Sequence, residues 1–358
     1  MIVFFSIGHP KDVHTYRNLC HRLKQAGYEC IAVCNNRQYN VELLEHFRID
    51  HFCISEHAKN VFGKVLILFK ETSKLLKLSR EYSPDIFISH SSLSLGIIAR
   101  ICGKPHIAIE DTFNMEQVRL SMLFTDTVLT GNYTHPSLGK KEIRYPGYHE
   151  LAYLHPNVFF PNESVLNSLR VKKCEKYAII RFVAWAATHD IGHKGMSMEN
   201  KKKLVEVLTK HLKVFISSEE ELPPDLKKYQ IPIKSEDMHS ALAFAHLFFG
   251  ESSTMATESA VLGTPSVYIN DSQLGYIKDL ERRGLIFSFT ESSEDQVLAI
   301  NKSIDIAIND KSIYESKAKK MLKDKIDVTA FLEWYVSNYP SSKREMMKDT
   351  KFDFSRFR

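Results

Sequence analysis

The chain has 358 residues, of which 44% are hydrophobic and 25% are charged, a composition that excludes disordered chains and disulfide-rich miniature folds. At roughly 100–200 residues per domain, this length predicts two domains. Lys and Arg (48) exceed Asp and Glu (43), and the formal charge of +5 is too small to predict a nucleic-acid partner, although it is compatible with a polyanionic small molecule.

Strand-length apolar runs alternate with amphipathic helical stretches through the first half of the chain. Strands are predicted at residues 2–7, 30–34, 51–54, 85–89, 106–109 and 127–129. Helices are predicted between them, at residues 12–26, 41–47, 61–82, 93–102 and 115–124. This alternation is typical of a parallel sheet with helices on both faces.

The alternation fails between about residues 132 and 167, where Pro and Gly punctuate the sequence, so this segment is the best linker candidate. It resumes with strands predicted at 177–184, 214–217, 247–249 and 266–269, and helices at 199–212, 238–245 and 253–262. Residues 311–339 have helical periodicity. We therefore expect an α/β fold with domains at 1–165 and 166–325, followed by a C-terminal helix and tail at 326–358 that pack back on the first domain.

The end of the chain, residues 343–358, is basic and partly aromatic. We expect a frayed tail, and peripheral contact with an anionic membrane is the alternative.

The six cysteines include no Cys-x-x-Cys pair and are expected to be free thiols of the core in a reducing compartment. The first residues lack the features of a signal peptide, and no apolar stretch approaches the roughly 18 residues of a membrane span. These observations favour a cytoplasmic location.

Polar segments follow several predicted strands, which is where open α/β sheets bind ligands. They begin near Gly8, Ser89, Glu110, Ala187 and Gly250. His9 and Glu110 are the best-placed candidates for a general base in the first half of the chain.

The sharpest local pattern is Gly250-Glu251-Ser252-Ser253-Thr254, which ends a predicted strand and opens a helix. The free N–H groups of such a helix start can bind phosphate, and Glu258 lies one turn further along. The alternative interpretation is that Ser252 or Ser253 is a helix cap and Glu258 a solvated helix residue.

His189, Asp190 and His193 have the spacing of metal ligands on a helix, but Gly192 and Gly195 favour a loop. We therefore expect no metal here. A phosphate-contacting loop is favoured instead, with Lys194 and with Arg181 from the strand before it.

The pattern from Gly250 through Ser252, Ser253, Glu258 and Gly263 to Pro265 resembles the nucleotide-sugar segment of the GT-B superfamily. That superfamily includes UDP-N-acetylglucosamine 2-epimerase and the glycosyltransferase that completes lipid II. The resemblance implies two Rossmann-like domains facing across a cleft, with the diphosphate at Ser252, Ser253 and Thr254 and the ribose at Glu258.

The whole chain is similar to an uncharacterised prokaryotic family related to that epimerase, through residues 8–14, 146–156 and 188–190. The resemblance places Glu110 where the epimerase has a catalytic glutamate, and His189 in a loop that touches the diphosphate. Residues 89–92, Ser-His-Ser-Ser, replace the epimerase's His-Gly-Asp-Thr turn, and the loss of its aspartate argues against epimerisation.

Our first expectation is a metal-independent glycosyltransferase that uses a nucleotide sugar, with UDP as the nucleotide, and an acceptor of surface polysaccharide or glycolipid synthesis. Glu110 or His9 would take the acceptor proton, and His189 and Lys194 would stabilise the leaving diphosphate. A UDP-N-acetylglucosamine 2-epimerase-like enzyme and a non-catalytic nucleotide-sugar-binding protein are the alternatives.

Overall fold

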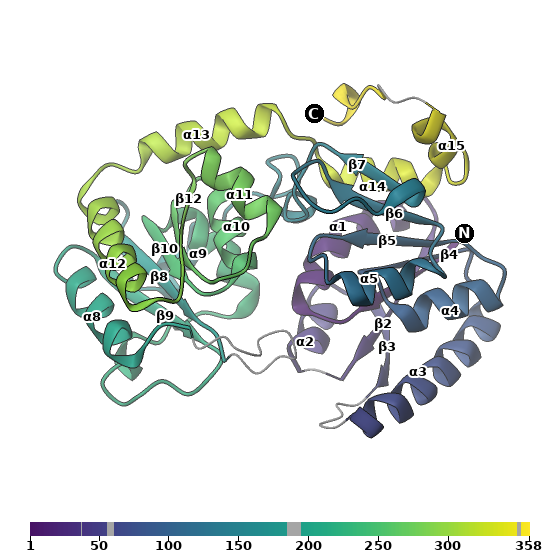
Figure 1. The fold of residues 1–358 in the computed structure, drawn as a ribbon, viewed down its shortest axis with the longest axis horizontal. Helices are drawn as coiled ribbons and strands as arrows, with labels where there is room; N and C mark the ends of the chain where they lie inside the picture. Colours follow the sequence, from purple (N-terminus) through teal and green to yellow (C-terminus); the bar gives the residue numbers. More distant parts are fainter. Residues whose placement is uncertain (37, 56–60, 185–194, 349–351) are drawn as a thin grey trace. The chain divides into compact units, whose positions relative to one another are not determined.

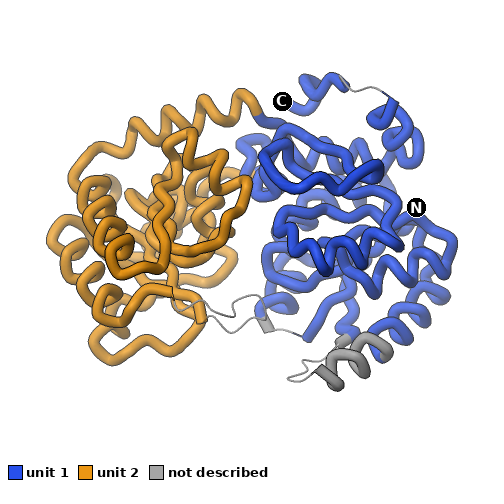
Figure 2. The backbone as a smooth tube through the Cα atoms, in the orientation of Figure 1, with its two compact units in different colours: residues 1–158, 325–358 blue, residues 159–324 orange. Residues whose placement is uncertain are grey.

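The computed structural model describes residues 1–36, 38–55, 61–184, 195–348 and 352–358. The chain forms two compact units, which are shown in different colours in Figure 2. Residues 1–158 and 325–358 make the N-terminal unit, and residues 159–324 make the C-terminal unit. The end of the chain therefore completes the unit with which the chain begins.

A seven-stranded parallel sheet forms the centre of the N-terminal unit (Figure 1). Its strands, in the order β3-β2-β1-β4-β5-β6-β7, are β1 (Ile2–Ile7), β2 (Glu29–Asn35), β3 (Asp50–Ser55), β4 (Ile86–Ser89), β5 (His106–Glu110), β6 (Thr127–Gly131) and β7 (Glu142–Tyr145). The helices of this unit are α1 (Pro10–Gln25), α2 (Gln38–His46), α3 (Val61–Tyr82), α4 (Leu93–Ile101), α5 (Met115–Met122), α6 (Leu151–Leu154), α14 (Val328–Ser337) and α15 (Ser341–Lys348).

Successive side chains of a strand point to opposite faces of the sheet, and Val3, Phe4 and Phe5 of β1 are all buried, so both faces of this sheet are covered. Phe4 packs against Phe87 with ring centroids 5.8 Å apart, in a cluster that includes Leu95 of α4. The next residue, Phe5, contacts Tyr16 of α1 across the other face, at 5.2 Å between centroids. The apolar runs of the sequence thus become strands with helices on either side, and the α/β prediction is confirmed.

The C-terminal unit is built on a five-stranded parallel sheet in the order β12-β11-β10-β8-β9. Its strands are β8 (Tyr177–Phe182), β9 (Lys213–Ser218), β10 (Leu247–Gly250), β11 (Ser266–Ile269) and β12 (Ile286–Phe289). Its helices are α7 (Ser164–Ser168), α8 (Met198–Leu208), α9 (Met238–Phe244), α10 (Ser253–Val261), α11 (Gly275–Arg282), α12 (Ser293–Ile308) and α13 (Ser312–Lys323).

Each sheet has one point at which the strand order reverses. In the N-terminal unit it lies between β1 and β4, and in the C-terminal unit between β8 and β10. Open α/β sheets bind their ligands at the carboxyl ends of the strands beside this point. The loops that follow β1, β4, β8 and β10 are therefore the places to look for function.

The predicted linker contains an element that the sequence pattern missed. β7 lies inside it and pairs with β6 at the edge of the sheet. Ile143 and Tyr145 are buried while Arg144 between them is exposed, so this short strand shows no apolar run.

The predicted helix at 311–339 is two helices, α13 and α14, because a short connection at residues 324–327 interrupts it. Asp327 begins the second helix, since its carboxylate accepts the Ala330 N–H at 2.9 Å.

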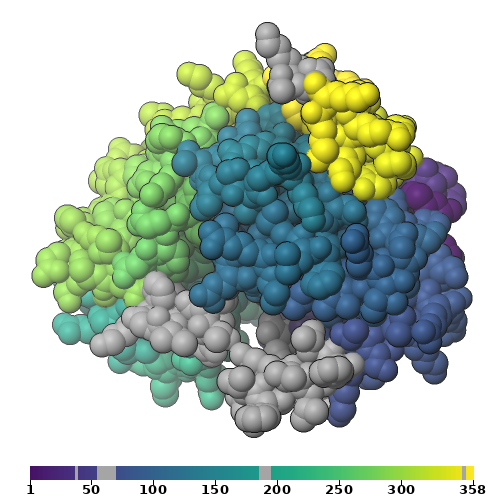
Figure 3. Space-filling model, turned by 45° about the vertical axis from the view of Figure 1, so that its right-hand side comes forward, coloured from purple at the N-terminus to yellow at the C-terminus, as the bar shows by residue number. Residues whose placement is uncertain are grey.

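The expectation of a frayed tail is wrong for the last residues. Phe357 is 6% exposed and its ring lies 5.6 Å from that of Trp334 in α14. The Arg356 guanidinium stacks over Trp334 at 4.1 Å, and the Phe357 carbonyl accepts the Asp327 N–H. Figure 3 shows the C-terminal residues, in yellow, on the surface of the unit they complete. In the described ranges, no helix has both the length and the apolar character needed to cross a membrane.

Candidate functional site

Charged and imidazole side chains gather at the carboxyl edge of the seven-stranded sheet, at its point of reversal. They are Lys11 and Asp12 at the start of α1, His90 after β4, Glu110 and Asp111 at the end of β5, and His149 and Glu150 after β7. We call these seven residues the His90 cluster. Six of them are buried, and His90 is the partly exposed member.

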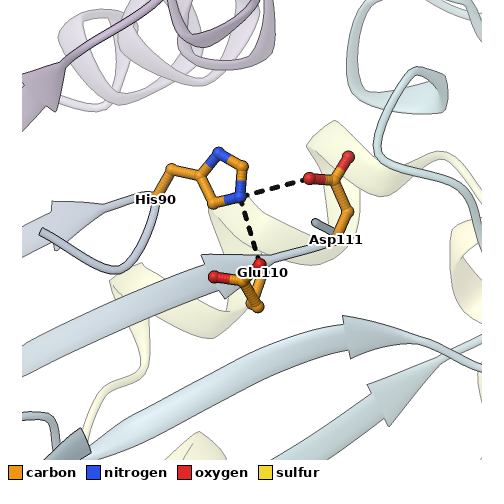
Figure 4. A group of neighbouring side chains, drawn as sticks. All are labelled: His90, Glu110 and Asp111. Carbon is orange, nitrogen blue, oxygen red and sulfur yellow. Dashed lines mark ion pairs between the residues drawn. The ribbon is translucent and has the colours of Figure 1, made fainter. Parts of the chain in front are cut away.

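His90 lies between three carboxylates. Its Nε2 is 3.1 Å from Asp111 Oδ1 and 3.4 Å from Glu110 Oε1. Figure 4 marks these two ion pairs with dashed lines. Its Nδ1 is 3.7 Å from Asp12 Oδ1. The His90 side chain is 21% exposed, whereas the three carboxylates are 5% exposed or less. Of these four groups, His90 is the one best able to meet a substrate.

The carboxylates determine the charge of His90. Burial alone would lower its pKa, but the charge of Glu110 and the hydrogen bonds to Asp111 and Asp12 raise the pKa of His90 well above its usual value. Burial in turn would raise the pKa of Glu110, yet His90 and a hydrogen bond from Ser91 lower it. At neutral pH the cluster therefore holds an imidazolium among carboxylates.

Lys11 supplies a second cation. Its Nζ forms ion pairs with Asp111 and, at 2.9 Å, with Glu150. Although burial would raise the pKa of Asp111, Lys11, His149 and His90 hold it well below its usual value. Burial raises the pKa of Glu150 in spite of Lys11. Burial also lowers the pKa of His149 to about 4, so its ring is neutral.

The loops that carry the cluster have left-handed backbone at two residues. Ser91, directly after His90, has φ 48°, and Phe113 has φ 55°. Glu110 holds both loops: its Oε1 accepts the N–H groups of Thr112 and Phe113 at 2.8 Å, and its Oε2 accepts the Ser91 hydroxyl at 2.5 Å. Such conformations cost about 1–3 kcal/mol each and concentrate at functional sites.

Three of these residues could also serve as metal ligands. Ligand atoms of His90, Glu110 and Asp111 lie within 4.8 Å of one another. Within the cluster, however, Lys11 already compensates Asp111, and His90 carries its own positive charge. Glu110 accepts hydrogen bonds on both oxygens. The arrangement suits acid–base chemistry without an added cation.

The predicted phosphate segment follows β10 in the C-terminal unit. Ser252 is the N-cap of α10, and its hydroxyl accepts the Met255 N–H at 3.4 Å. The capping interpretation of Ser252 is therefore right for its hydroxyl. It does not exclude anion binding, because the first-turn N–H groups at Ser253 and Thr254 have no partner within an α-helix.

Glu258 is not the solvated helix residue of the alternative interpretation. It is 4% exposed, and its Oε1 is 3.1 Å from Nε2 of His239.

Arg181 at the end of β8 contacts Ser217 at 2.7 Å and forms an ion pair with Glu219 at 2.6 Å. Both partners come from β9 or the residue that follows it, so the Arg181 guanidinium is held beside that strand.

No role was predicted for Glu251, which follows β10 directly. Its carboxylate is buried and accepts the N–H groups of Val183 and Met196 at 2.9 and 2.7 Å. It fixes the backbone beside the reversal point of this sheet.

The other predicted residues have different outcomes. His9 caps α1, because its Nδ1 accepts the Lys11 N–H at 3.2 Å, and its side chain is exposed. His189 and Lys194, together with the rejected metal ligands Asp190 and His193, lie outside the described residues.

Sequence reasoning missed Lys11, Asp111, His149 and Glu150, and it gave His90 no role. The available signal was that most of these residues follow predicted strands. What the sequence could not reveal is that β4 lies next to β1, which brings His90 beside Asp12.

Residues 1–331 match the family described as "Protein of unknown function (DUF354)", and the chain belongs to this family. It is 21% identical over 276 residues to an uncharacterized protein of Methanocaldococcus jannaschii, an alignment that covers 74% of this chain and 80% of that protein.

Solved structures share the fold. The S. aureus MnaA–UDP structure has a TM-score of 0.69 at 13% identity and covers 99% of both chains. The Neisseria meningitidis UDP-GlcNAc 2-epimerase bound to UDP-GlcNAc has a TM-score of 0.60 at 12% identity, covering 90% of this chain and 99% of that one. The spinosyn forosaminyltransferase SpnP has a TM-score of 0.62 at 12% identity, covering 94% and 99%. The fold is therefore of the GT-B type, akin to nucleotide-sugar epimerases and glycosyltransferases.

Proposed function

We propose that this DUF354 protein is a glycosyltransferase that moves a sugar from a UDP-sugar to a hydroxyl group of an acceptor in surface polysaccharide or glycolipid synthesis. The observation that carries the proposal is the His90 cluster. A partly exposed imidazole is held by buried carboxylates where an open α/β sheet binds its ligand. The GT-B fold supports the nucleotide-sugar class of the substrate.

His90 is the base in this proposal. The reaction breaks the bond between C1 of the sugar and the diphosphate oxygen, which keeps the electron pair, and joins C1 to the acceptor oxygen. The imidazolium of His90 must first release to water the proton that it holds at neutral pH, and the acceptor proton then passes to the ring, so the rate of transfer should rise as the pH approaches the raised pKa of His90. Glu110 orients the ring and stabilises the imidazolium that forms.

The charge of the His90 cluster favours the acceptor over the diphosphate. It has four carboxyl groups, on Asp12, Glu110, Asp111 and Glu150, against the cations of Lys11 and His90. A surplus of carboxylates repels a diphosphate and tolerates a neutral sugar hydroxyl.

We assign the nucleotide to the C-terminal unit. The first turn of α10, with Ser252, Ser253 and Thr254, binds the diphosphate, and Glu258 binds the ribose. His189 and Lys194 stabilise the negative charge as the diphosphate leaves. Arg181 is a weaker candidate for this role, because Glu219 already pairs with it.

One observation favours a second candidate, a nucleotide-sugar 2-epimerase. Removing the C2 proton and returning it on the other face needs two acid–base groups, and Glu110 and Asp111 both lie beside His90. Asp111 would then supply a carboxylate in place of the aspartate that residues 89–92 lack. A protein that binds nucleotide sugars without catalysis is the remaining alternative.

Incubation with UDP-sugars in the absence of an acceptor separates these functions. A transferase gives slow hydrolysis at most, an epimerase gives the C2 isomer, and a binding protein gives only a higher melting temperature. Adding sugar or lipid-linked acceptors should then accelerate UDP release by the transferase.

A melting-temperature panel tests nucleotide binding itself. Ligand at a hundredfold excess over Kd should stabilise the protein by about 2.7 kcal/mol. If no nucleotide or nucleotide sugar shifts the transition, all three functions are wrong.

A further inference from the structure

Two thiols lie side by side in the N-terminal sheet. Cys34 of β2 and Cys53 of β3 are paired in the register of these parallel strands, and their Sγ atoms are 3.4 Å apart. Neighbouring strands are about 4.8 Å apart, which falls within the Cα separation of about 4.4–6.8 Å that a disulfide requires. The sulfurs would need to approach by about 1.4 Å to reach bonding distance.

The two thiols differ in their access to solvent. Cys53 is exposed, whereas Cys34 is buried. The expectation that all six cysteines are core thiols is therefore wrong for Cys53, and also for Cys174, which is exposed. Cys53 lies on the edge strand of the sheet, where one side of the chain meets solvent. An oxidant in solution can therefore reach Cys53 directly, whereas burial shields Cys34 from it.

We propose that Cys34 and Cys53 are an oxidation site that forms a reversible disulfide when the protein meets a peroxide. The Cys53 thiolate attacks one peroxide oxygen, the O–O bond breaks, and Cys53 becomes a sulfenic acid as hydroxide leaves. The sulfur of Cys34 then attacks the sulfur of Cys53, and the S–O bond breaks. The proton of Cys34 leaves with that oxygen as water, so two thiols are oxidised by two electrons and one peroxide is reduced.

The order of these steps follows from burial. Burial and the neighbouring Cys53 thiol raise the pKa of Cys34 to about 12, so Cys34 stays a thiol and does not react with the oxidant first. Its contact with Cys53 then favours the second step, because the reacting sulfurs are already neighbours.

A chain of contacts connects this pair to the His90 cluster. The β2–β3 register shifts directly after Cys34, at Asn35. The Asn35 side chain donates to the Gly8 carbonyl at 3.1 Å, and the Gly8 N–H donates to the Asp12 carboxylate at 2.8 Å. Drawing Cys34 toward Cys53 therefore acts on the backbone that positions Asp12 beside His90.

The test is peptide mapping of the oxidised full-length protein. The folded chain is treated with hydrogen peroxide, blocked with N-ethylmaleimide, digested without reduction and analysed by mass spectrometry. We expect a linked peptide pair that contains Cys34 and Cys53, and about a tenfold loss of maleimide labelling at Cys53 that dithiothreitol reverses.

Cys53→Ser should abolish the linked pair, and because residue 53 is exposed this variant should fold even where Cys34→Ser does not. Cys174→Ser, at the other exposed cysteine, should leave the pair unchanged. Irreversible oxidation of Cys53 without a linked peptide, or a link to any other cysteine, overturns the proposal.

The connection to the cluster is tested separately by proton NMR of the histidine rings, with the His90 signal assigned from its loss in His90→Gln. That signal should move on oxidation of the parent protein and stay in place in Cys53→Ser. A disulfide that forms without moving it refutes the connection. Neither readout depends on a nucleotide sugar, so failure here is distinguishable from failure of the proposed function.

Discussion

Single residues in the His90 cluster hold one another in defined charge states. His90 has its pKa raised by its carboxylate neighbours, whereas the pKa values of Asp12, Glu110 and Asp111 are lowered. A raised histidine pKa contributes stability that is fully present below the unfolded value of about 6.5 and is lost as pH rises through the folded value. The lowered carboxylates contribute stability that is present above about pH 4 and is lost on acidification.

His90→Gln should therefore remove an alkaline loss of stability. We expect the parent N-terminal unit to be less stable at pH 9 than at pH 6, and the variant to show a smaller difference. The variant should also be less stable by about 3 kcal/mol at pH 6, because buried carboxylates lose their partner. Urea unfolding at the two pH values measures this. His21→Gln, at an exposed histidine of α1, should behave like the parent. If the free energy of unfolding changes equally between pH 6 and pH 9 in all three proteins, the charge assignment of His90 is wrong.

Glu258→Gln tests the proposed ribose contact without opening a cavity. Since Glu258 is buried against His239, an Ala substitution would disturb packing as well as binding. The amide keeps the volume but loses the charged acceptor, and we expect UDP binding to weaken by about 1.5–3 kcal/mol. Calorimetry with UDP measures this. Glu206→Gln, at an exposed glutamate of α8, is the control, and equal affinity in the two variants would leave Glu258 with a structural role alone.

At the scale of helices and strands, local sequence pattern located many of the elements that have an apolar run of their own. β1, α3 and β11 have the bounds that periodicity predicts. β7 was missed because only alternate residues of this edge strand are buried. The segment with α11, β12 and α12 was not predicted either, although the amphipathic character of its helices follows the usual rule.

The end of the chain shows that a basic, aromatic tail can be an integral element. Phe357→Ala should destabilise the N-terminal unit by about 3 kcal/mol, because it empties a buried site between Phe331 and Trp334. Thermal or urea unfolding measures this loss. Phe160→Ala, at a phenylalanine that is 79% exposed, should change stability by less than about 0.5 kcal/mol. If both variants melt like the parent, the tail does not pack in solution.

At the scale of the whole molecule, the candidate site depends on strand order, which no local pattern contains. Alternation of strands and helices predicted two α/β units, and the resemblance pointed to the GT-B fold that the solved structures confirm. The His90 cluster, however, joins residues that lie as far apart in sequence as Lys11 and Glu150. Only the parallel order of seven strands brings them to one edge, so the sequence could indicate candidates but not their contacts.

The way in which the molecule balances charge leads to the last prediction, that the proposed transferase activity survives EDTA. A leaving diphosphate needs positive compensation, which enzymes supply either with a carboxylate-bound divalent ion or with helix termini and basic side chains. The sequence contains no Asp-x-Asp motif, and the N-terminus of α10 offers the second solution. Among the possible metal ligands His90, Glu110 and Asp111, His90 is itself an imidazolium, and Asp111 is already paired with the Lys11 ammonium.

Release of UDP in the presence of acceptor, measured with and without EDTA, tests this prediction, and we expect equal rates. Complete loss of activity in EDTA that magnesium or manganese restores would contradict it. The variant His193→Ala would then locate the ion. An unchanged metal requirement would place the ion at His90, Glu110 and Asp111, because these ligands remain in the variant. A loss of the response to metal would place it with His189 and Asp190.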